Sequence, residues 1–290
     1  MKVSVVIPNY NRTDILKRAI ESVLAQSVDV AEIIVVDDCS NNFTKDYLEA
    51  EIKPLRNVKI VFNTENMGAS GSRNVGVDNA ENELVAFLDS DDFWMPKKLE
   101  KQLPLFEENT KVELVYCSQE GVNTLYRGNV MSPLIDGWIP PNPSTVVFKR
   151  SVYLSLGGFD TTLKACEDHD FWFVFSKAGY SVDFIDEELT DFTDEAENRL
   201  SHNYEIRIDA LEKFIEKWKD TLVNERSLKH YQNYKREYTL KVVYPLFVNS
   251  VKQAKLISTL GIVWKYFVFN RMFYLMASHS MLRRIKRRVL

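Results

Sequence analysis

The sequence predicts an α/β fold, in which helices flank a mostly parallel sheet, followed by a helical C-terminal extension. The first observation is that short β-branched runs alternate with segments of helical periodicity through the first hundred of the 290 residues. The second is that only helical patterns follow residue 203. Because strand–helix–strand connections cross over in the right-handed sense, the alternating part builds a parallel sheet covered by helices.

Four apolar runs are the expected strands of this sheet, and the segments between them are the expected helices. The run at 3–7, VSVVI, is continuous and β-branched, which is typical of a strand buried on both faces. The segment at 13–27 carries Leu16, Ile20, Val23 and Leu24 at helical spacing. The other expected strands are 32–36, 58–62 and 84–88, and the other expected helices are 44–52 and about 70–80.

The pattern loosens between residues 110 and 200. VELVYC and STVVF are strand-like runs that flank the proline-rich SPLIDGWIPPNPS, LGGFD predicts a turn, and EDHDFWFVFSKAG predicts a helix with an acidic start. We therefore divide the chain into an α/β domain at 1–200 and a helical region at 201–290.

The net charge of -4 conceals a strong asymmetry along the chain. All 41 acidic residues lie in 1–240 with 27 basic ones, a charge of -14, whereas 241–290 contains ten basic residues and no acidic one. The acidic part would repel nucleic acid, so we expect no nucleic-acid partner.

Three cysteines lie far apart and form no CxxC pair. Cys39, Cys117 and Cys166 therefore offer neither a disulfide framework nor a zinc ribbon, which favours a reducing cytoplasm. Pro8 cuts the first apolar run short, so we expect no signal peptide.

Polar residues follow all four expected strands. The carboxyl ends of parallel strands share one edge of the sheet, where such folds bind their ligands. The sequence therefore predicts one crevice with five carboxylates. The residues that follow the strands are Pro8, Asn9 and Tyr10, then Asp37 and Asp38, then 66–71, and finally Asp89, Asp91 and Asp92.

The DSDD cluster at 89–92 needs something to offset the repulsion between its carboxylates. Carboxylates are hard ligands that suit Mg²⁺ or Mn²⁺, and Mg²⁺ completes its shell with water and substrate phosphates, so the cluster indicates a metal–diphosphate site. The alternatives are a solvated acidic turn, or a helix cap by Asp92.

Two other segments carry candidate chemistry. Gly68 and Gly71 precede a helix whose first turns hold Arg73, an arrangement that can receive phosphate. There is no GxGxxG after the first strand and no GxxxxGK[ST], which argues against NAD and P-loop chemistry.

The CEDHDFW segment offers carboxylates on either side of His169. One of them can serve as a general base near the mouth of the sheet, and the alternative is that they only favour the start of a helix. His169 is read as packing or surface rather than as a metal ligand.

Six stretches in this order resemble the family-2 glycosyltransferases (GT2), an inverting family with the GT-A fold, a Rossmann-like, mostly parallel sheet flanked by helices. They span residue 3 to about 175. The stretches are VSVVIPNYNR, IIVVDDCS, NMGASGSRNVG, FLDSDDFW, LGGFD and EDHDFW.

The resemblance implies a nucleotide-sugar donor, of which a UDP-sugar is the usual one, and a role for each matching residue. Asp38 is implied to contact the base, and Asp168 to act as general base. Asp89, Ser90 and Asp91 form the DxD element, in which Asp91 and Asp92 are implied to bind Mn²⁺ or Mg²⁺. The donor-binding residues implied in this way are Pro8, Tyr10, Asp37, Asp38, Arg73, Asp89, Ser90 and Asp91.

The implied reaction is a metal-dependent single displacement with inversion. One base without an enzymic nucleophile fits that reaction. Two other classes remain open, a metal-dependent phosphatase and a non-catalytic nucleotide-sugar-binding protein. Trp94, Trp138 and Trp172 are read as core packing rather than as sugar-stacking groups.

The segment 255–290 combines many aromatic residues with the basic end RRIKRR and no acids. Lys265, Asn270 and Arg271 interrupt its apolar run, so a transmembrane helix is not expected. The composition favours an interfacial anchor on anionic lipid, and the alternative is a helical appendage packed on protein. Together with family habit, it predicts a peripheral protein on the inner face of the membrane that extends a glycan or lipid-linked glycan of a cell-surface polysaccharide.

Overall fold

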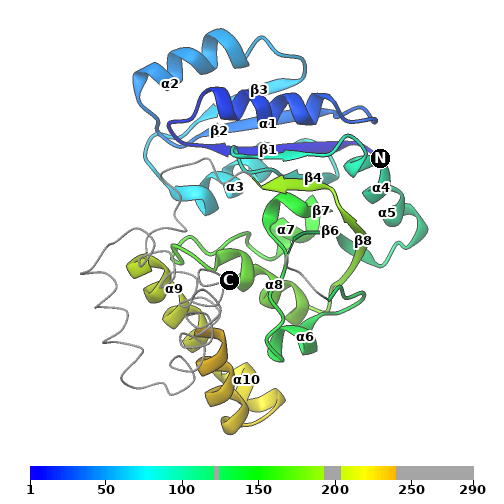
Figure 1. Cartoon of the computed structure of the whole chain (residues 1–290), viewed down its shortest axis with the longest axis vertical. Coiled ribbons are helices and arrows are strands. Elements are labelled where there is room, and N and C mark those ends of the chain that lie inside the picture. Colours follow the sequence, from blue (N-terminus) through cyan, green and yellow to red (C-terminus); the bar gives the residue numbers. More distant parts are fainter. Residues whose placement is uncertain (121–123, 193–203, 240–290) are drawn as a thin grey trace, which may run out of the picture. The chain divides into compact units, whose positions relative to one another are not determined.

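The computed structural model describes residues 1–120, 124–192 and 204–239 (Figure 1). It divides the chain into two compact units, Met1–Glu197 and Asn198–Leu290.

The first unit is built on a seven-stranded sheet with the order β3-β2-β1-β4-β7-β6-β8. β1 is parallel to β2 and β4, β2 is parallel to β3, and β6 is parallel to β8, whereas β7 is antiparallel to β4 and β6. The predicted mostly parallel sheet is therefore confirmed. The strands are β1 (Val3–Asn9), β2 (Glu32–Asp37), β3 (Val58–Phe62), β4 (Leu84–Phe87), β6 (Val112–Ser118), β7 (Val146–Lys149) and β8 (Ser181–Glu188).

A second, two-stranded sheet pairs β5 (Asp92–Trp94) antiparallel with β9 (Thr190–Phe192). The acidic cluster that ends β4 therefore continues directly into a strand. The alternative that Asp92 caps a helix is wrong.

Short helices connect these strands. The helices of the first unit are α1 (Asp14–Leu24), α2 (Asn42–Tyr47), α3 (Gly68–Asn79), α4 (Lys98–Gln102), α5 (Pro104–Glu108), α6 (Met131–Ile135), α7 (Arg150–Ser155) and α8 (Glu167–Lys177), with a π-helical turn η1 (Leu48–Ile52) and a 3₁₀ turn η2 (Pro143–Thr145). The helix expected at 44–52 is thus an α-helix only to Tyr47, and the wider π turn completes it.

The two faces of the sheet are covered differently, because side chains alternate along a strand. Val3, Val5 and Ile7 share a buried cluster with residues of α1 and η1. Val6 points to the other face, where a Cβ added to Gly76 of α3 would lie 2.2 Å from its Cγ1. Gly76 therefore permits the close approach of α3 to β1, and Figure 1 shows α1 and α3 on opposite sides of β1.

The described part of the second unit is helical, as predicted after residue 203. It contains α9 (Tyr204–Lys217), α10 (Lys219–Glu225) and a helix at 228–239. Their buried residues include Leu211, Phe214 and Leu222. No helix among the described residues is long and apolar enough to cross a membrane. The segment 255–290, for which we predict lipid binding, lies outside the described residues.

Lys98 is an unusual residue in the core of the first unit. Its side chain is fully buried and has no carboxylate partner among the described residues. Its Nζ donates to Gln102 Oε1 at 2.7 Å and lies 4.1 Å from the centre of the Trp94 ring. Burial lowers the pKa of Lys98 to about 8, because the charged form loses its hydration.

The Lys98→Met variant tests this burial through the pH dependence of stability. Between about pH 8 and the ordinary lysine pKa of about 10.4, the unfolded chain keeps a proton on Lys98 that the folded chain has lost, so folding stability rises with pH. We expect the wild type to gain on the order of 3 kcal/mol relative to Lys98→Met across this window, as measured by urea unfolding. Lys97→Met, at an exposed neighbour, serves as the control. Equal pH slopes in all three proteins would contradict the assignment.

Candidate functional site

The carboxyl ends of β1, β2, β3 and β4 lie along one edge of the sheet, because these four strands are parallel neighbours. Two backbone hydrogen bonds continue the pairing past the strand ends. Asp38 N donates to Asn9 O and Asn63 N donates to Asp37 O, each at 2.8 Å. The predicted convergence of the four strand-end segments is therefore confirmed.

Asp38 holds the start of α3 against the end of β2. Its Oδ1 accepts hydrogen bonds from Asn63 Nδ2 at 3.0 Å and from Met67 N at 2.8 Å, and its Oδ2 accepts from Gly68 N at 2.8 Å. The carboxylate thus occupies the positive end of α3, the position at which the sequence predicted a phosphate. A carboxylate has about four acceptor sites, so Asp38 keeps the capacity for one further donor.

The other residues proposed for the nucleotide differ in their access to solvent. Asp37 is fully buried, and its Oδ2 accepts from Ser40 N at 3.0 Å, so it shapes the turn after β2. Pro8 lies buried within β1 opposite Val36. Tyr10 is 51% exposed and is available to a ligand.

The acidic loop after β4 is balanced by groups from distant parts of the chain. Arg73 Nη2 lies 2.5 Å from Asp89 Oδ1, and Arg12 Nη1 lies 2.9 Å from Asp91 Oδ1. Ser144 belongs to η2, and its Oγ donates to Asp92 Oδ2 at 2.7 Å and accepts from Asp89 N at 3.0 Å. The protein itself therefore supplies much of the compensation for which the sequence suggested water or a metal ion.

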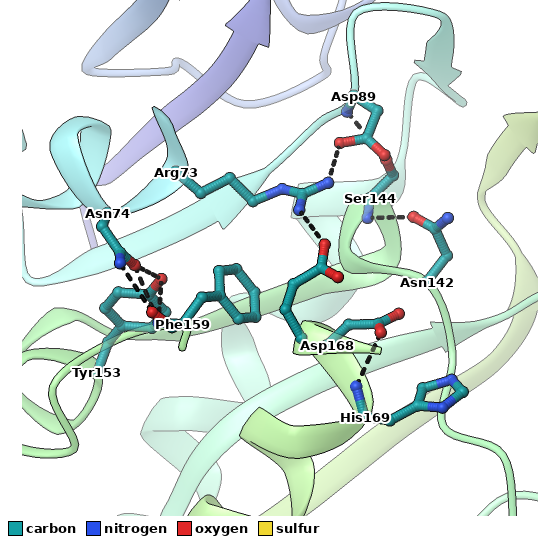
Figure 2. Close-up of polar contacts among 10 residues, drawn as sticks. Arg73, Asn74, Asp89, Asn142, Ser144, Tyr153, Phe159, Asp168 and His169 are labelled. Carbon is teal, nitrogen blue, oxygen red and sulfur yellow. Dashed lines mark hydrogen bonds and ion pairs between the residues drawn. The ribbon is translucent and has the colours of Figure 1, made fainter. Parts of the chain in front are cut away.

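Arg73 joins this acidic loop to the start of α8. Its side chain is 4% exposed, and Nη1 lies 3.4 Å from Glu167 Oε1 while Nη2 contacts Asp89. Figure 2 shows the guanidinium between Asp89 and the helix that carries Asp168. Burial opposes the charge of Arg73, but the neighbouring carboxylates outweigh it and raise its pKa. The Arg73 Nε is buried without a hydrogen-bond partner among the described residues.

The start of α8 carries two adjacent carboxylates. Burial, and secondarily the charge of Asp168, raises the pKa of Glu167 to about 7. Asp168 is partly exposed, and its Oδ1 accepts from His169 N at 2.8 Å (Figure 2). The helix begins after Cys166, which adopts a left-handed φ of 63°. The acidic residues do favour the helix start, as the alternative interpretation held, and Asp168 still reaches solvent.

The LGGFD turn is fixed to the same part of α3. Asn74 Nδ2 donates to Phe159 O, while Asn74 Oδ1 accepts from Phe159 N, both at 2.9 Å, and also from Tyr153 Oη at 2.6 Å. Gly158 has a φ of 72°, and a Cβ there would lie 2.5 Å from Asn74 Oδ1. The turn thus needs glycine, and it packs beside the arginine that joins the two acidic elements.

The three aromatic candidates are packing groups, as expected, and two of them are fully enclosed in the core. Trp94 and Trp172 are buried. Trp138 is partly exposed, but its ring packs edge-to-face against Trp172 and Tyr126, and its indole Nε1 donates to Thr124 O at 3.1 Å.

The carboxylates of this site can bind a divalent cation only if the substrate supplies further ligands to the ion. Among the described residues, no group of three or more His, Cys, Asp or Glu side chains is arranged to hold a metal ion. Asp91 has a side chain that is 10% exposed at the edge of the sheet. Mg²⁺ is commonly held by one or two carboxylates together with substrate phosphates, and this chemistry fits Asp91.

The sequence analysis assigned no role to two residues of the site, Arg12 and Ser144. Arg12 carried a signal, because it follows the first strand-end segment. Ser144 carried none, because a serine in a proline-rich segment has many other roles.

A family model described as "Glycosyl transferase family 2" matches residues 4–177. An uncharacterized glycosyltransferase of Haemophilus influenzae is 32% identical over 180 residues, which cover 58% of this chain and 60% of that protein. The putative teichuronic acid biosynthesis glycosyltransferase TuaG of Bacillus subtilis is 44% identical over 108 residues, 37% of this chain and 43% of TuaG. The matches thus span less than two thirds of either relative.

Two solved structures share the fold of this chain. Staphylococcus aureus TarS 1–349 in complex with UDP-GlcNAc has a TM-score of 0.62 at 20% identity, over 92% of this chain and 80% of TarS 1–349. The mannosyltransferase PcManGT of Pyrobaculum calidifontis, in complex with GDP-Man and Mn²⁺, has a TM-score of 0.60 at 20% identity, over 96% and 86% of the two chains. At this identity the likeness shows the fold alone, and it confirms the predicted fold class.

Replacing Arg73 by Met tests the junction between the acidic loop and α8. The change leaves Asp89 and Glu167 without their buried cation, so we expect the free energy of unfolding to fall by about 3–5 kcal/mol in urea titrations. The control is Arg56→Met, because the ion pair of Arg56 with Asp29 is largely exposed and should cost less than about 1 kcal/mol. Similar losses in the two variants would contradict a special role for Arg73.

Proposed function

The chain belongs to glycosyl transferase family 2, and from this premise we propose that it transfers a sugar from a nucleotide-sugar donor to an acceptor hydroxyl, with inversion at the anomeric carbon. One observation carries the proposal. Arg73 contacts Asp89 of the acidic loop and Glu167, the neighbour of Asp168, so that the proposed leaving-group site and the proposed base lie on either side of one guanidinium.

We propose that the donor lies along the carboxyl ends of β1, β2 and β4, and that it is a UDP-sugar. The exposed Tyr10 and the remaining acceptor capacity of Asp38 support a base site there. The buried Pro8 and Asp37 would support that site from within the ends of β1 and β2. The loop Asp89–Ser90–Asp91 would face the diphosphate. Arg73 contributes by fixing Asp89, since both of its Nη atoms contact carboxylates.

Asp91, with Asp92 beside it, would hold Mn²⁺ or Mg²⁺ together with the donor diphosphate. A divalent cation bound there neutralises negative charge that grows on the departing diphosphate. Asp92 supports the loop through Ser144, which links it to the backbone of Asp89.

Asp168 is the proposed general base. Attack at the anomeric carbon requires removal of the acceptor proton as the new bond forms, and Asp168 Oδ2 is positioned on a partly exposed side chain whose Oδ1 is held by His169 N. A single displacement inverts the configuration, since no enzymic nucleophile intervenes. Glu167 lies beside Asp168 at this helix start, and its pKa is raised to about 7 by burial and secondarily by the charge of Asp168.

The acceptor that we propose is a glycan or lipid-linked glycan in cell-surface polysaccharide synthesis, reached from the cytoplasmic side. The support is the composition of 255–290, where aromatic residues precede RRIKRR without any acid. A juxtamembrane basic residue contributes about 1 kcal/mol to binding of an anionic membrane.

The Asp168→Asn variant tests the proposed chemistry. It retains the shape of the side chain but accepts no proton, so we expect sugar transfer to fall at least about a hundredfold while nucleotide affinity stays within about twofold. Transfer is measured as nucleotide release from UDP-sugars in the presence of membrane extract, and affinity by calorimetry. Asp186→Asn, at an exposed residue of β8, is the matched control. Full turnover by Asp168→Asn would remove this base, and release of inorganic phosphate without sugar transfer would indicate a phosphatase.

Vesicle co-sedimentation tests the membrane proposal. We expect the wild type to sediment with phosphatidylserine vesicles at low salt, and the variant with Arg283, Arg284, Lys286, Arg287 and Arg288 replaced by Gln to remain in solution. Neutral phosphatidylcholine vesicles are the control. Equal sedimentation of the two proteins would contradict an electrostatic anchor.

A further inference from the structure

We propose that Arg12 is a ligand of the donor diphosphate, a role that rests on the proposed function and deepens it. Arg12 lies in the loop between β1 and α1, and its guanidinium reaches across to the acidic loop after β4. Its Nη1 donates to Ser90 Oγ and contacts Asp91 Oδ1, both at 2.9 Å.

The guanidinium of Arg12 is held by one edge only. Nη1 makes both contacts to the acidic loop, while Nε and Nη2 make no hydrogen bond within 1–120, 124–192 or 204–239. The side chain is 25% exposed, in contrast to 4% for Arg73. Two planar donors are therefore presented beside the loop that is proposed to face the diphosphate, and guanidinium groups bind phosphate oxygens through such paired donors.

The backbone that carries Arg12 is fixed before any ligand arrives. Asn9 Nδ2 donates to Arg12 O at 3.2 Å, and Asn11 adopts a left-handed φ of 51°. Asn11 N donates to Ser40 Oγ at 2.8 Å, and Asn11 Oδ1 accepts from Asn41 N at 2.9 Å. These contacts clamp the loop after β1 to the loop after β2, so binding requires little ordering of this backbone.

The carboxyl ends of the strands carry several acidic side chains, so binding of an anionic diphosphate there needs a cationic group such as Arg12. An anionic diphosphate that approaches Asp37, Asp38, Asp89 and Asp91 is repelled unless cations compensate. Arg73 is buried between two carboxylates and cannot turn to the ligand without leaving them unpaired. Arg12 can bind the diphosphate with Nε and Nη2 while Nη1 stays on Asp91, and it does so with or without a divalent cation.

The test compares UDP with uridine by calorimetric titration, each in Mn²⁺ and in EDTA. Arg12→Gln keeps a donor for Ser90 but loses the charge, so we expect its affinity for UDP to fall at least about tenfold in each condition under which the wild type binds. Its affinity for uridine should stay within about twofold. The affinity of Arg12→Lys for UDP should lie between that of the wild type and that of Arg12→Gln.

Arg18→Ala is the matched control, because Arg18 is an exposed arginine of the following helix that stacks on Phe93 at 4.2 Å. It should leave both affinities unchanged, and thermal unfolding verifies that each variant is folded. If Arg12→Gln binds UDP as tightly as Arg18→Ala, the role of Arg12 is wrong and the donor site stands. If the wild type binds no UDP in either condition, both this inference and the proposed function fail.

Discussion

The buried guanidinium of Arg73 is the interaction on which the arrangement of this site depends. It contacts Asp89 after β4 and Glu167 at the start of α8, two carboxylates that lie far apart in the sequence. The same helix turn carries Asn74, which fixes the LGGFD turn, and Gly76, which allows α3 to lie against β1. About one turn of α3 thus positions the sheet, the acidic loop and the proposed base relative to one another. Because a buried cation is costly unless paired, the two carboxylates and the arginine stabilise one geometry.

The five aspartates at the carboxyl ends of β2 and β4 differ from a simple cluster of metal ligands, because each carboxylate has its own partner in the protein. Asp38 caps α3, Asp37 holds the turn after β2, Asp89 and Asp91 meet arginines, and Asp92 accepts from Ser144. Only part of this charge is left for a ligand. The balance fits a donor that brings its own phosphates and a cation, as opposed to a metal ion enclosed by protein alone.

The sheet and its crevice could be predicted from sequence, because β-branched runs such as 3–7 form strands and parallel strands place their ends together. The partners of the acidic loop could not. Arg12 and Ser90 are 78 residues apart, and their contact depends on how two loops pack. The pairing of β5 with β9 and the π turn that ends α2 likewise depend on tertiary packing, which overrides local propensity. The family resemblance supplied the candidate residues of the site, but the contacts of Arg73 and Asp38 with protein carried no sequence signal.

The most direct measurement is calorimetric titration of the purified protein with UDP, GDP, dTDP and CMP, each with Mn²⁺ and again with EDTA. We expect saturable binding of one nucleoside diphosphate, UDP, that is strengthened by Mn²⁺, because the carboxylates and arginines at this edge of the sheet are arranged for a diphosphate and a shared cation. Absence of binding by all four nucleotides in both conditions would contradict a donor site at the carboxyl ends of β1, β2 and β4.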